Sequence, residues 1–325
     1  MRHVVRLLVA VALVAAAPAA LAAFTSATSA ANTVATAADW IAPSASSTVI
    51  GKTTGYLAGS IKQGGTYYVY ANVADSGNPA SGIATVKADV SAVTSGQTNL
   101  TLTAGTYSVN GVSYNYRSAS QTAGSPLSGT KNYTITSADA LAYSNLQTGY
   151  TVALDNTAPT ATGISTGNTG GGNQGLAEAG DTITFTFSEQ IDPQSILAGW
   201  TGASTNVTVE FQDGGCLLVL CGSDSFTIPG LPFGTVDLAS AGYYGCTVIG
   251  IVCDKTPASF VNSAMVASAN TITITLGARS GGSGSFNDVG SNNDMAWDST
   301  TTPYDAAGNA ASGNIFTETD NDFEF

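Results

Sequence analysis

Alternation of apolar and polar residues is the main pattern of this chain from about Thr48 onward. Asp181–Phe187, Thr205–Phe211 and Thr271–Leu276 place an apolar residue at every second position, the period of a strand with one buried face. Thr66–Val73 is rich in aromatic and β-branched residues, which favour strands. The pattern predicts an all-β protein, and we expect two tandem β-sandwich domains.

A hairpin is the most specific local prediction. Asn110-Gly111 tolerates the positive φ angles of a type I′ turn and lies between two strand-like runs. This turn puts Val109 opposite Val112 and Tyr107 opposite Tyr114, with Tyr116 further along the same face.

Short helical turns are expected at two places. Asp192-Pro193 is a good helix start, because proline suits the first helical position and aspartate suits the cap. The run Asp139–Tyr143 is expected to form one helical turn between strands.

Four segments follow from these patterns. We predict an export signal over 1–22, a leader or linker over 23–47, one sandwich over 48–156, and a second over 157–325. The boundary rests on Asp155-Asn-Thr-Ala-Pro159, where proline and small polar residues end a strand and start an extended connector.

The N-terminus has the form of a signal peptide. Arg2 and Arg6 precede an apolar run from Leu7 to Ala17, and Ala20-Leu-Ala22 offers a small-x-small cleavage sequence. The alternative is an uncleaved membrane anchor, although the 18 residues from Leu7 to Phe24 barely reach spanning length and Pro18 interrupts them. We therefore predict a secreted or cell-surface protein that contacts a membrane only if this segment is retained.

Charge excludes one class of partner. The chain carries 22 acidic and 9 basic residues, a net charge of −13, and charged residues are only 10% of it. Loss of Arg2 and Arg6 would leave seven basic residues and a charge of −15. So acidic a surface repels phosphate backbones, and nucleic-acid binding is not expected.

The number and positions of the cysteines and histidines limit the chemistry that this chain can perform. The single histidine, His3, lies in the predicted export signal, so a processed chain has no imidazole for a catalytic triad and catalysis is not expected. All four cysteines lie within 216–253, which predicts two disulfides in an exported protein, with three connectivities open. The local pairing would join Cys216 to Cys221 and Cys246 to Cys253. The apolar segments that they frame either pack into the core or form exposed tips.

Three motifs carry a family resemblance. Asp155-Asn-Thr-Ala-Pro159, Glu178-Ala-Gly-Asp-Thr-Ile-Thr-Phe-Thr-Phe-Ser-Glu189 and Tyr304-Asp-Ala-Ala-Gly-Asn309 resemble the boundary, early-strand and closing motifs of bacterial Ig-like domains. The resemblance implies that the two β-sandwich domains are immunoglobulin-like, as in modules of surface-layer proteins, adhesins and secreted matrix proteins. The start of the predicted processed chain, residues 23–40, resembles that of camelysin-like exported proteins. The cysteine-framed segments depart from the family pattern.

Calcium is the only cofactor that the residues suggest. Carboxylate and amide oxygens, which hard cations prefer, gather at the boundary and in later turns. The candidate ligands are Asp155, Asn156, Glu178, Asp181, Asp305 and Asn309. Aspartate and asparagine are also common in turns without any metal, so the alternative is a purely structural role.

Tyrosine gives a second candidate surface. Ten of the 13 tyrosines precede residue 151, and an exposed face of Tyr107, Tyr114 and Tyr116 would suit a sugar ring. The structural alternative is that these rings fill the sandwich. We predict a non-catalytic structural or adhesive protein whose partner is an extracellular protein, a polysaccharide or another copy. The alternative function is an accessory carbohydrate-binding module.

Overall fold

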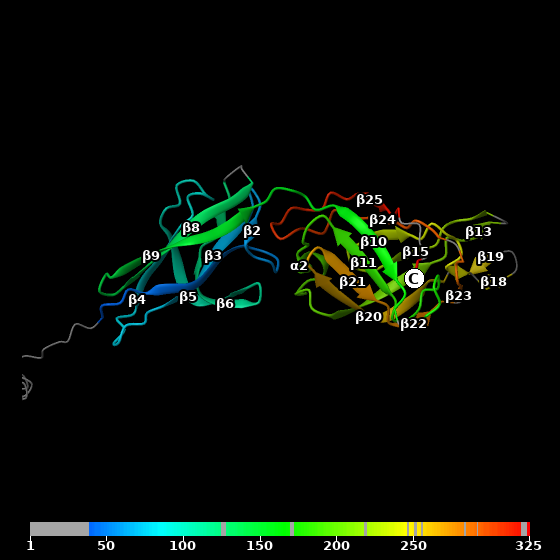
Figure 1. Cartoon of the computed structure of the whole chain (residues 1–325), viewed down its shortest axis with the longest axis horizontal. Coiled ribbons are helices and arrows are strands. Elements are labelled where there is room, and N and C mark those ends of the chain that lie inside the picture. Colours follow the sequence, from blue (N-terminus) through cyan, green and yellow to red (C-terminus); the bar gives the residue numbers. More distant parts are fainter. Residues whose placement is uncertain are drawn as a thin grey trace, which may run out of the picture.

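The computed structural model confirms the all-β fold class, with one short helix among the described residues (Figure 1). It describes residues 39–124, 128–169, 172–217, 220–245, 247–249, 252–254, 256–282, 284–290, 292–319 and 324–325. The strands form two groups, each around its own apolar core. We refer to residues 39–154 as the N-terminal unit and residues 161–325 as the C-terminal unit.

The N-terminal unit is a nine-stranded sheet in the order β1-β3-β6-β5-β4-β8-β9-β2, with β7 also paired to β3. Its strands are β1 (Ser44–Lys52), β2 (Ser60–Ile61), β3 (Thr66–Ala74), β4 (Ile83–Asp89), β5 (Leu100–Val109), β6 (Val112–Ser118), β7 (Gln121–Thr122), β8 (Gly129–Asp139) and β9 (Ser144–Leu154). The Gln147 side chain exchanges two hydrogen bonds with the backbone of Ala45. The sheet therefore folds over until β9 approaches β1.

The predicted hairpin is confirmed in the N-terminal unit. Val109 lies opposite Val112 and Tyr107 opposite Tyr114. Asn110 and Gly111 have φ angles of 51° and 72°, as a type I′ turn requires.

The C-terminal unit is built on a ten-stranded sheet in the order β10-β11-β21-β20-β12-β15-β16-β24-β25, with β22 paired to β20. Its strands are β10 (Ala161–Gly167), β11 (Thr182–Phe187), β12 (Thr205–Gln212), β15 (Ser225–Thr227), β16 (Thr235–Asp237), β20 (Ala258–Ser268), β21 (Thr271–Thr275), β22 (Ala278–Gly281), β24 (Ala296–Asp298) and β25 (Ile315–Thr317). Three small sheets pair β13 (Cys216–Leu217) with β14 (Leu220–Cys221), β17 (Tyr244–Gly245) with β23 (Ser285–Phe286), and β18 (Thr247–Ile249) with β19 (Val252–Asp254).

The C-terminal core follows the alternation seen in the sequence. Ile183, Phe185 and Phe187 of β11 are buried while the threonines between them are half-buried. The Phe185 ring lies 4.5 Å from that of Phe233 and 4.9 Å from that of Trp297. This core also closes at its edge, because the Asn314 amide exchanges two hydrogen bonds with the backbone of Ala161.

Two local expectations meet different outcomes. Helix α2 (Pro193–Ile196) starts at Asp192-Pro193 as predicted, and the Asp192 side chain caps it. The helical turn expected over Asp139–Tyr143 is wrong: these residues join β8 to β9 as a tight turn in which Ala142 has a φ angle of 68°. Its cause is the Asp139 carboxylate, which accepts the N–H groups of Leu141 and Tyr143.

The N-terminal limit also differs from the expected position. Strand β1 begins at Ser44, before the predicted boundary at 48. The predicted export signal lies outside the described residues. Within the described part of the chain, no helix has the length and apolar character needed to cross a membrane.

Candidate functional site

The residues that join the two units centre on Asp192. This aspartate is fully buried and accepts the Gln194 N–H as the N-cap of α2. It also accepts the N–H groups of Tyr56 and Leu57, at 2.9–3.0 Å, from the loop between β1 and β2. One carboxylate therefore caps a helix in the C-terminal unit and binds a loop of the N-terminal unit.

Lys52 completes this contact from the end of β1. Its Nζ lies 2.5 Å from Asp192 Oδ2 and also donates to the carbonyl oxygens of Ala306 and Leu57, at 2.8 and 3.1 Å. The three donors of the ammonium group are thus all used. Burial lowers the pKa of Lys52, and the charge and hydrogen bond of Asp192 oppose that shift. The Lys52–Asp192 pair is a buried ion pair between the units.

The backbone around this pair leaves no spare room. Gly55 has a φ angle of +95°, and a Cβ atom there would lie 2.6 Å from Asp192 Oδ2.

Lys62 N–H donates to the Ala307 carbonyl at 3.1 Å, and Gln63 N–H donates to Asn156 Oδ1 at 2.7 Å. The junction is held by several polar contacts rather than by one.

Three carboxylates gather beside the pair. Asp155 of the connector, Glu189 after β11 and Asp305 before the C-terminal strand β25 each offer an oxygen within 4.8 Å of the others. Asp305 is buried, whereas Asp155 and Glu189 are half-buried. We call these three residues the junction carboxylates.

Asn309 links the side chain of Asp305 to the backbone of Asp155. Its Nδ2 donates to Asp305 Oδ2 at 2.8 Å and to the Asp155 carbonyl at 3.0 Å. Asp305 Oδ1 also accepts the N–H groups of Gly308 and Asn309. The connector is therefore fastened to the loop that carries Asp305.

Crowding of like charges makes Glu189 unusual. Burial, followed by the nearby Asp305 and Asp155 carboxylates, raises the pKa of Glu189 to about 8. A carboxyl in this position keeps its proton at neutral pH unless a cation replaces that proton. The donor set of three carboxylates fits a hard cation such as Ca²⁺ in charge and atom type. The calcium hypothesis stays a prediction.

The structure separates the six predicted calcium ligands. Asp155, Asp305 and Asn309 meet at the junction, but Asn156 turns away and bonds to Gln63 N–H and Ser128 Oγ. Glu178 and Asp181 lie before β11, whereas Glu189 follows it. Because six strand residues span roughly 20 Å, these two carboxylates are at the opposite end of β11.

Glu178 and Asp181 instead organise their own loop. Asp181 is buried and accepts the N–H groups of Glu178 and Thr169. Burial raises the pKa of Asp181, while these hydrogen bonds oppose that shift. Glu189 was not predicted as a calcium ligand, although it is the last residue of the motif that begins at Glu178. The length of β11 places Glu178 and Glu189 at opposite ends of the strand, so only one of them could lie near the junction.

The three predicted sugar-binding tyrosines do not form one exposed platform. Tyr114 is buried and packs 5.6 Å from the Tyr70 ring. The Arg117 guanidinium covers Tyr107 from 4.4 Å. Tyr116 is half-buried at the edge of the core.

The cysteine segments are described only in part. Cys216 lies opposite Cys221 in the β13–β14 pair, a placement compatible with the predicted local disulfide, and none of the described cysteines is free. Cys246 lies outside the described residues, and so do the side chains of both framed apolar segments. The pairing stays a prediction.

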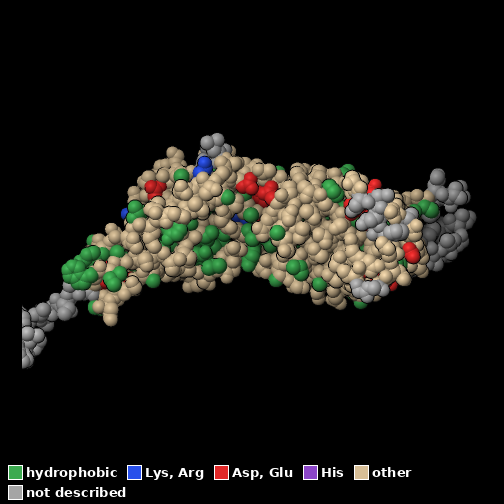
Figure 2. Space-filling model, in the orientation of Figure 1, with side chains coloured by type: hydrophobic (Ala, Val, Ile, Leu, Met, Phe, Trp, Pro, Cys, Tyr) green, Lys and Arg blue, Asp and Glu red, His purple; other side chains and the backbone are tan. Residues whose placement is uncertain are grey.

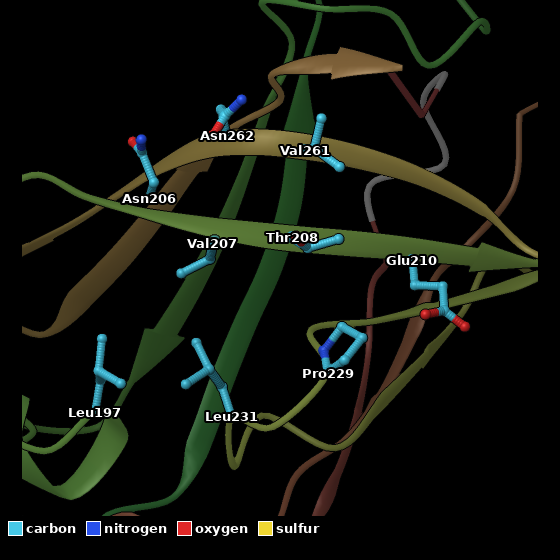
Figure 3. A pocket seen from close by; sticks show the side chains of 9 residues that line it. All are labelled: Leu197, Asn206, Val207, Thr208, Glu210, Pro229, Leu231, Val261 and Asn262. Carbon is cyan, nitrogen blue, oxygen red and sulfur yellow. The ribbon is translucent and has the colours of Figure 1, made fainter. Parts of the chain in front are cut away.

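A groove of about 550 Å³ lies on the C-terminal unit, beside the irregular register of β12 and β20 (Figure 3). Its lining is mixed: Leu197, Asn206, Val207, Thr208, Glu210, Pro229, Leu231, Val261 and Asn262. The lining residues include no aromatic ring on which a sugar could stack.

Comparison with known proteins returns no match: no family model, curated protein or solved structure is similar to this chain. The geometry of the site therefore has to support any functional proposal.

Proposed function

We propose that this chain is an extracellular structural or adhesive protein, built from two Ig-like sandwich domains, that acts by contact rather than by catalysis. The single observation that carries the proposal is the Lys52–Asp192 pair between the units. In this proposal the two domains form a stiff spacer, which holds a contact surface at a defined distance from its attachment.

The chemistry of the pair favours a geometric role. Burying two charges costs desolvation energy that their attraction only partly returns, so such a pair adds little to stability. It does penalise any arrangement in which either charge loses its partner. A pair that also caps α2 and binds two N–H groups of the other unit accepts few alternative orientations.

The absence of catalysis in this proposal is supported by the surroundings of the acidic residues. Both side-chain oxygens of Asp305 accept hydrogen bonds from neighbouring N–H groups. Three grooves in the described part of the chain are lined in part by Asn206, Phe286 and Trp200, respectively. None of the three is lined by a junction carboxylate. Glycoside hydrolysis needs two carboxyl groups that face a substrate cleft.

Fractionation tests the proposed location. N-terminal sequencing of the chain from medium, cell surface and cytoplasm should find a form that begins near Ala23 outside the cell. Recovery of only the intact Met1 form from the cytoplasm would contradict the proposal.

Binding assays test the proposed activity. Purified chain should sediment with the insoluble matrix of the producing cells, and turnover should be absent for a panel of polysaccharides and peptides. Sedimentation that a soluble sugar abolishes would favour the carbohydrate-binding alternative instead, and turnover of any panel compound would refute the non-catalytic role.

A further inference from the structure

The end of the N-terminal unit farthest from the junction exposes large apolar side chains. Trp40 is 72% exposed, Leu146 62% and Ile41 51%. Leu141 and Tyr143 are exposed in the turn between β8 and β9. We call these five residues the apolar tip, and Figure 2 shows hydrophobic side chains gathered at this end of the molecule.

Specific contacts hold the residues of the apolar tip in place. The Trp40 and Tyr143 rings lie 6.0 Å apart, which joins the start of the N-terminal unit to the β8–β9 turn. Asp139 is buried and fixes that turn by accepting the N–H groups of Leu141 and Tyr143. Exposed apolar residues on an ordered turn are a recognised mark of a contact surface.

The aspartates near the apolar tip are hydrogen-bonded to the backbone, although the protein is acidic overall. Asp39 is buried and accepts the N–H groups of Ile41 and Ser81. Asp75 accepts those of Gly77 and Gly82. The segments 39–51, 74–83 and 139–146 contain no lysine or arginine. Together with Asp139, these aspartates bind backbone N–H groups, and none of the five side chains of the apolar tip is charged.

The position of the tip along the chain indicates an occupant. Trp40 and Ile41 directly follow residues 1–39, which include the apolar run from Leu7 to Ala17. Sixteen residues, 23–38, separate the predicted signal from Asp39. Sixteen residues can span at most roughly 55 Å, even when fully extended. A chain that keeps residues 1–22 in a membrane therefore holds the tip within that distance of the lipid surface.

We propose that the apolar tip inserts into the interfacial layer of a phospholipid bilayer. Tryptophan and tyrosine favour that layer because their rings are apolar at one end and polar at the other. This contact belongs to the folded unit itself, so it adds to any contact through residues 1–22. Since the protein is acidic, insertion is driven by apolar burial and gains nothing from anionic lipid.

The fluorescence of Trp40 can report insertion of the apolar tip into lipid. The chain has three tryptophans, and Trp200 and Trp297 are buried in the C-terminal core. Titrating the chain that begins at Ala23 with phosphatidylcholine vesicles should shift tryptophan emission to shorter wavelength, and lipids brominated on the acyl chain should quench it. The full chain should show the same shift at lower lipid concentration because residues 1–22 anchor it.

Matched variants separate the tip from general hydrophobicity. Leu141→Ser with Leu146→Ser keeps Trp40 and should weaken partitioning roughly tenfold or more, because binding scales with the apolar area buried. Val112→Ser with Ile315→Ser removes side chains that are 46% and 66% exposed elsewhere and should leave partitioning unchanged.

Four outcomes would overturn the proposal. They are no emission shift at millimolar lipid, an equal loss in the control variant, binding that requires anionic lipid, and a Trp40 shift that depends on protein concentration without lipid. The last would assign the tip to a second copy of this chain. Circular dichroism of each variant shows whether a lost shift reflects unfolding.

Discussion

The two ends of the N-terminal unit differ in whether another part of the chain covers them. At the junction, Lys52 is buried against Asp192 of the other unit, and their hydrogen-bonding groups are shared across the boundary. At the apolar tip, Asp39 and Asp139 turn inward to the backbone while Trp40 and Leu146 face outward. Each end thus hides its charges, but only the junction shows the surface that covers it.

This difference separates a completed contact from an open one. A buried ion pair is strongly directional, so the junction specifies one partner in one orientation. An exposed apolar surface is not directional and accepts any apolar phase of suitable shape. The contrast predicts that substitutions at the junction disturb folding, whereas those at the tip disturb association only.

Breaking the Lys52–Asp192 pair should have the largest effect. Lys52→Met or Asp192→Asn should lower the free energy of unfolding by about 3–5 kcal/mol, because the remaining partner is left buried without its counter-charge. Urea denaturation measures this. Lys87→Met, at a half-buried lysine of β4, is the control. The double variant should cost less than the two single losses added together, and strict additivity would contradict a direct interaction.

Filling the space beside Asp192 should have the next largest effect. Gly55→Ala and Gly59→Ala both place a side chain at a φ angle near +95°. Only the Cβ at Gly55 meets Asp192, since nothing lies within 4 Å of the one at Gly59. Gly55→Ala should therefore cost about 1–3 kcal/mol more in thermal or urea unfolding. Equal losses would mean that backbone strain alone is being measured.

The junction carboxylates should make stability depend on pH. Because the folded-state pKa of Glu189 is raised from 4.5 to about 8, the folded chain holds a proton that the unfolded chain has released in this range. Stability is then fully present below pH 4.5 and falls as pH rises to about 8. The loss should be about 1–2 kcal/mol, since solvent screens a half-buried group.

Glu189→Gln isolates the source of that pH-dependence. The variant should flatten unfolding free energy between pH 5 and 8, while Glu178→Gln, which leaves the junction intact, should keep the parent slope. An unchanged slope in Glu189→Gln would assign the effect to other groups.

Calcium should act on the same residues if the calcium hypothesis is right. At pH 8, calcium at about five times its dissociation constant would stabilise the chain by about 1 kcal/mol. Differential scanning calorimetry would show a higher Tm with calcium and a lower one with chelator. Glu189→Gln and Asp155→Asn should remove the response, and Glu178→Gln should retain it. A Tm that responds to neither addition would dismiss the hypothesis.

The smallest effect is expected at the tip. Leu146→Ser should change the free energy of unfolding by less than about 0.5 kcal/mol, because this side chain is already exposed in the folded state. Urea denaturation beside the Lys52 variants gives the comparison directly. A loss above 1 kcal/mol would show that the tip supports the fold.

Part of the candidate site could be found from the sequence. Asp155 and Asp305 were proposed from the boundary and closing motifs, and they do meet at the junction. Glu189 was missed, and Glu178 and Asp181 were grouped with residues at the other end of β11. Proximity in a motif misleads here, because a strand carries residues only a few positions apart to opposite ends of a sheet.

The sequence by itself determined the features that depend on near neighbours. Alternation in β11 gave its buried face, Asn110-Gly111 its turn, and Asp192-Pro193 its helix start. Tertiary structure alone decided that Asp192 also meets Lys52, 140 positions away. It likewise decided that Trp40 lies beside Tyr143. Local backbone preferences act over a few residues, whereas the partner of a buried charge depends on how whole sheets are placed.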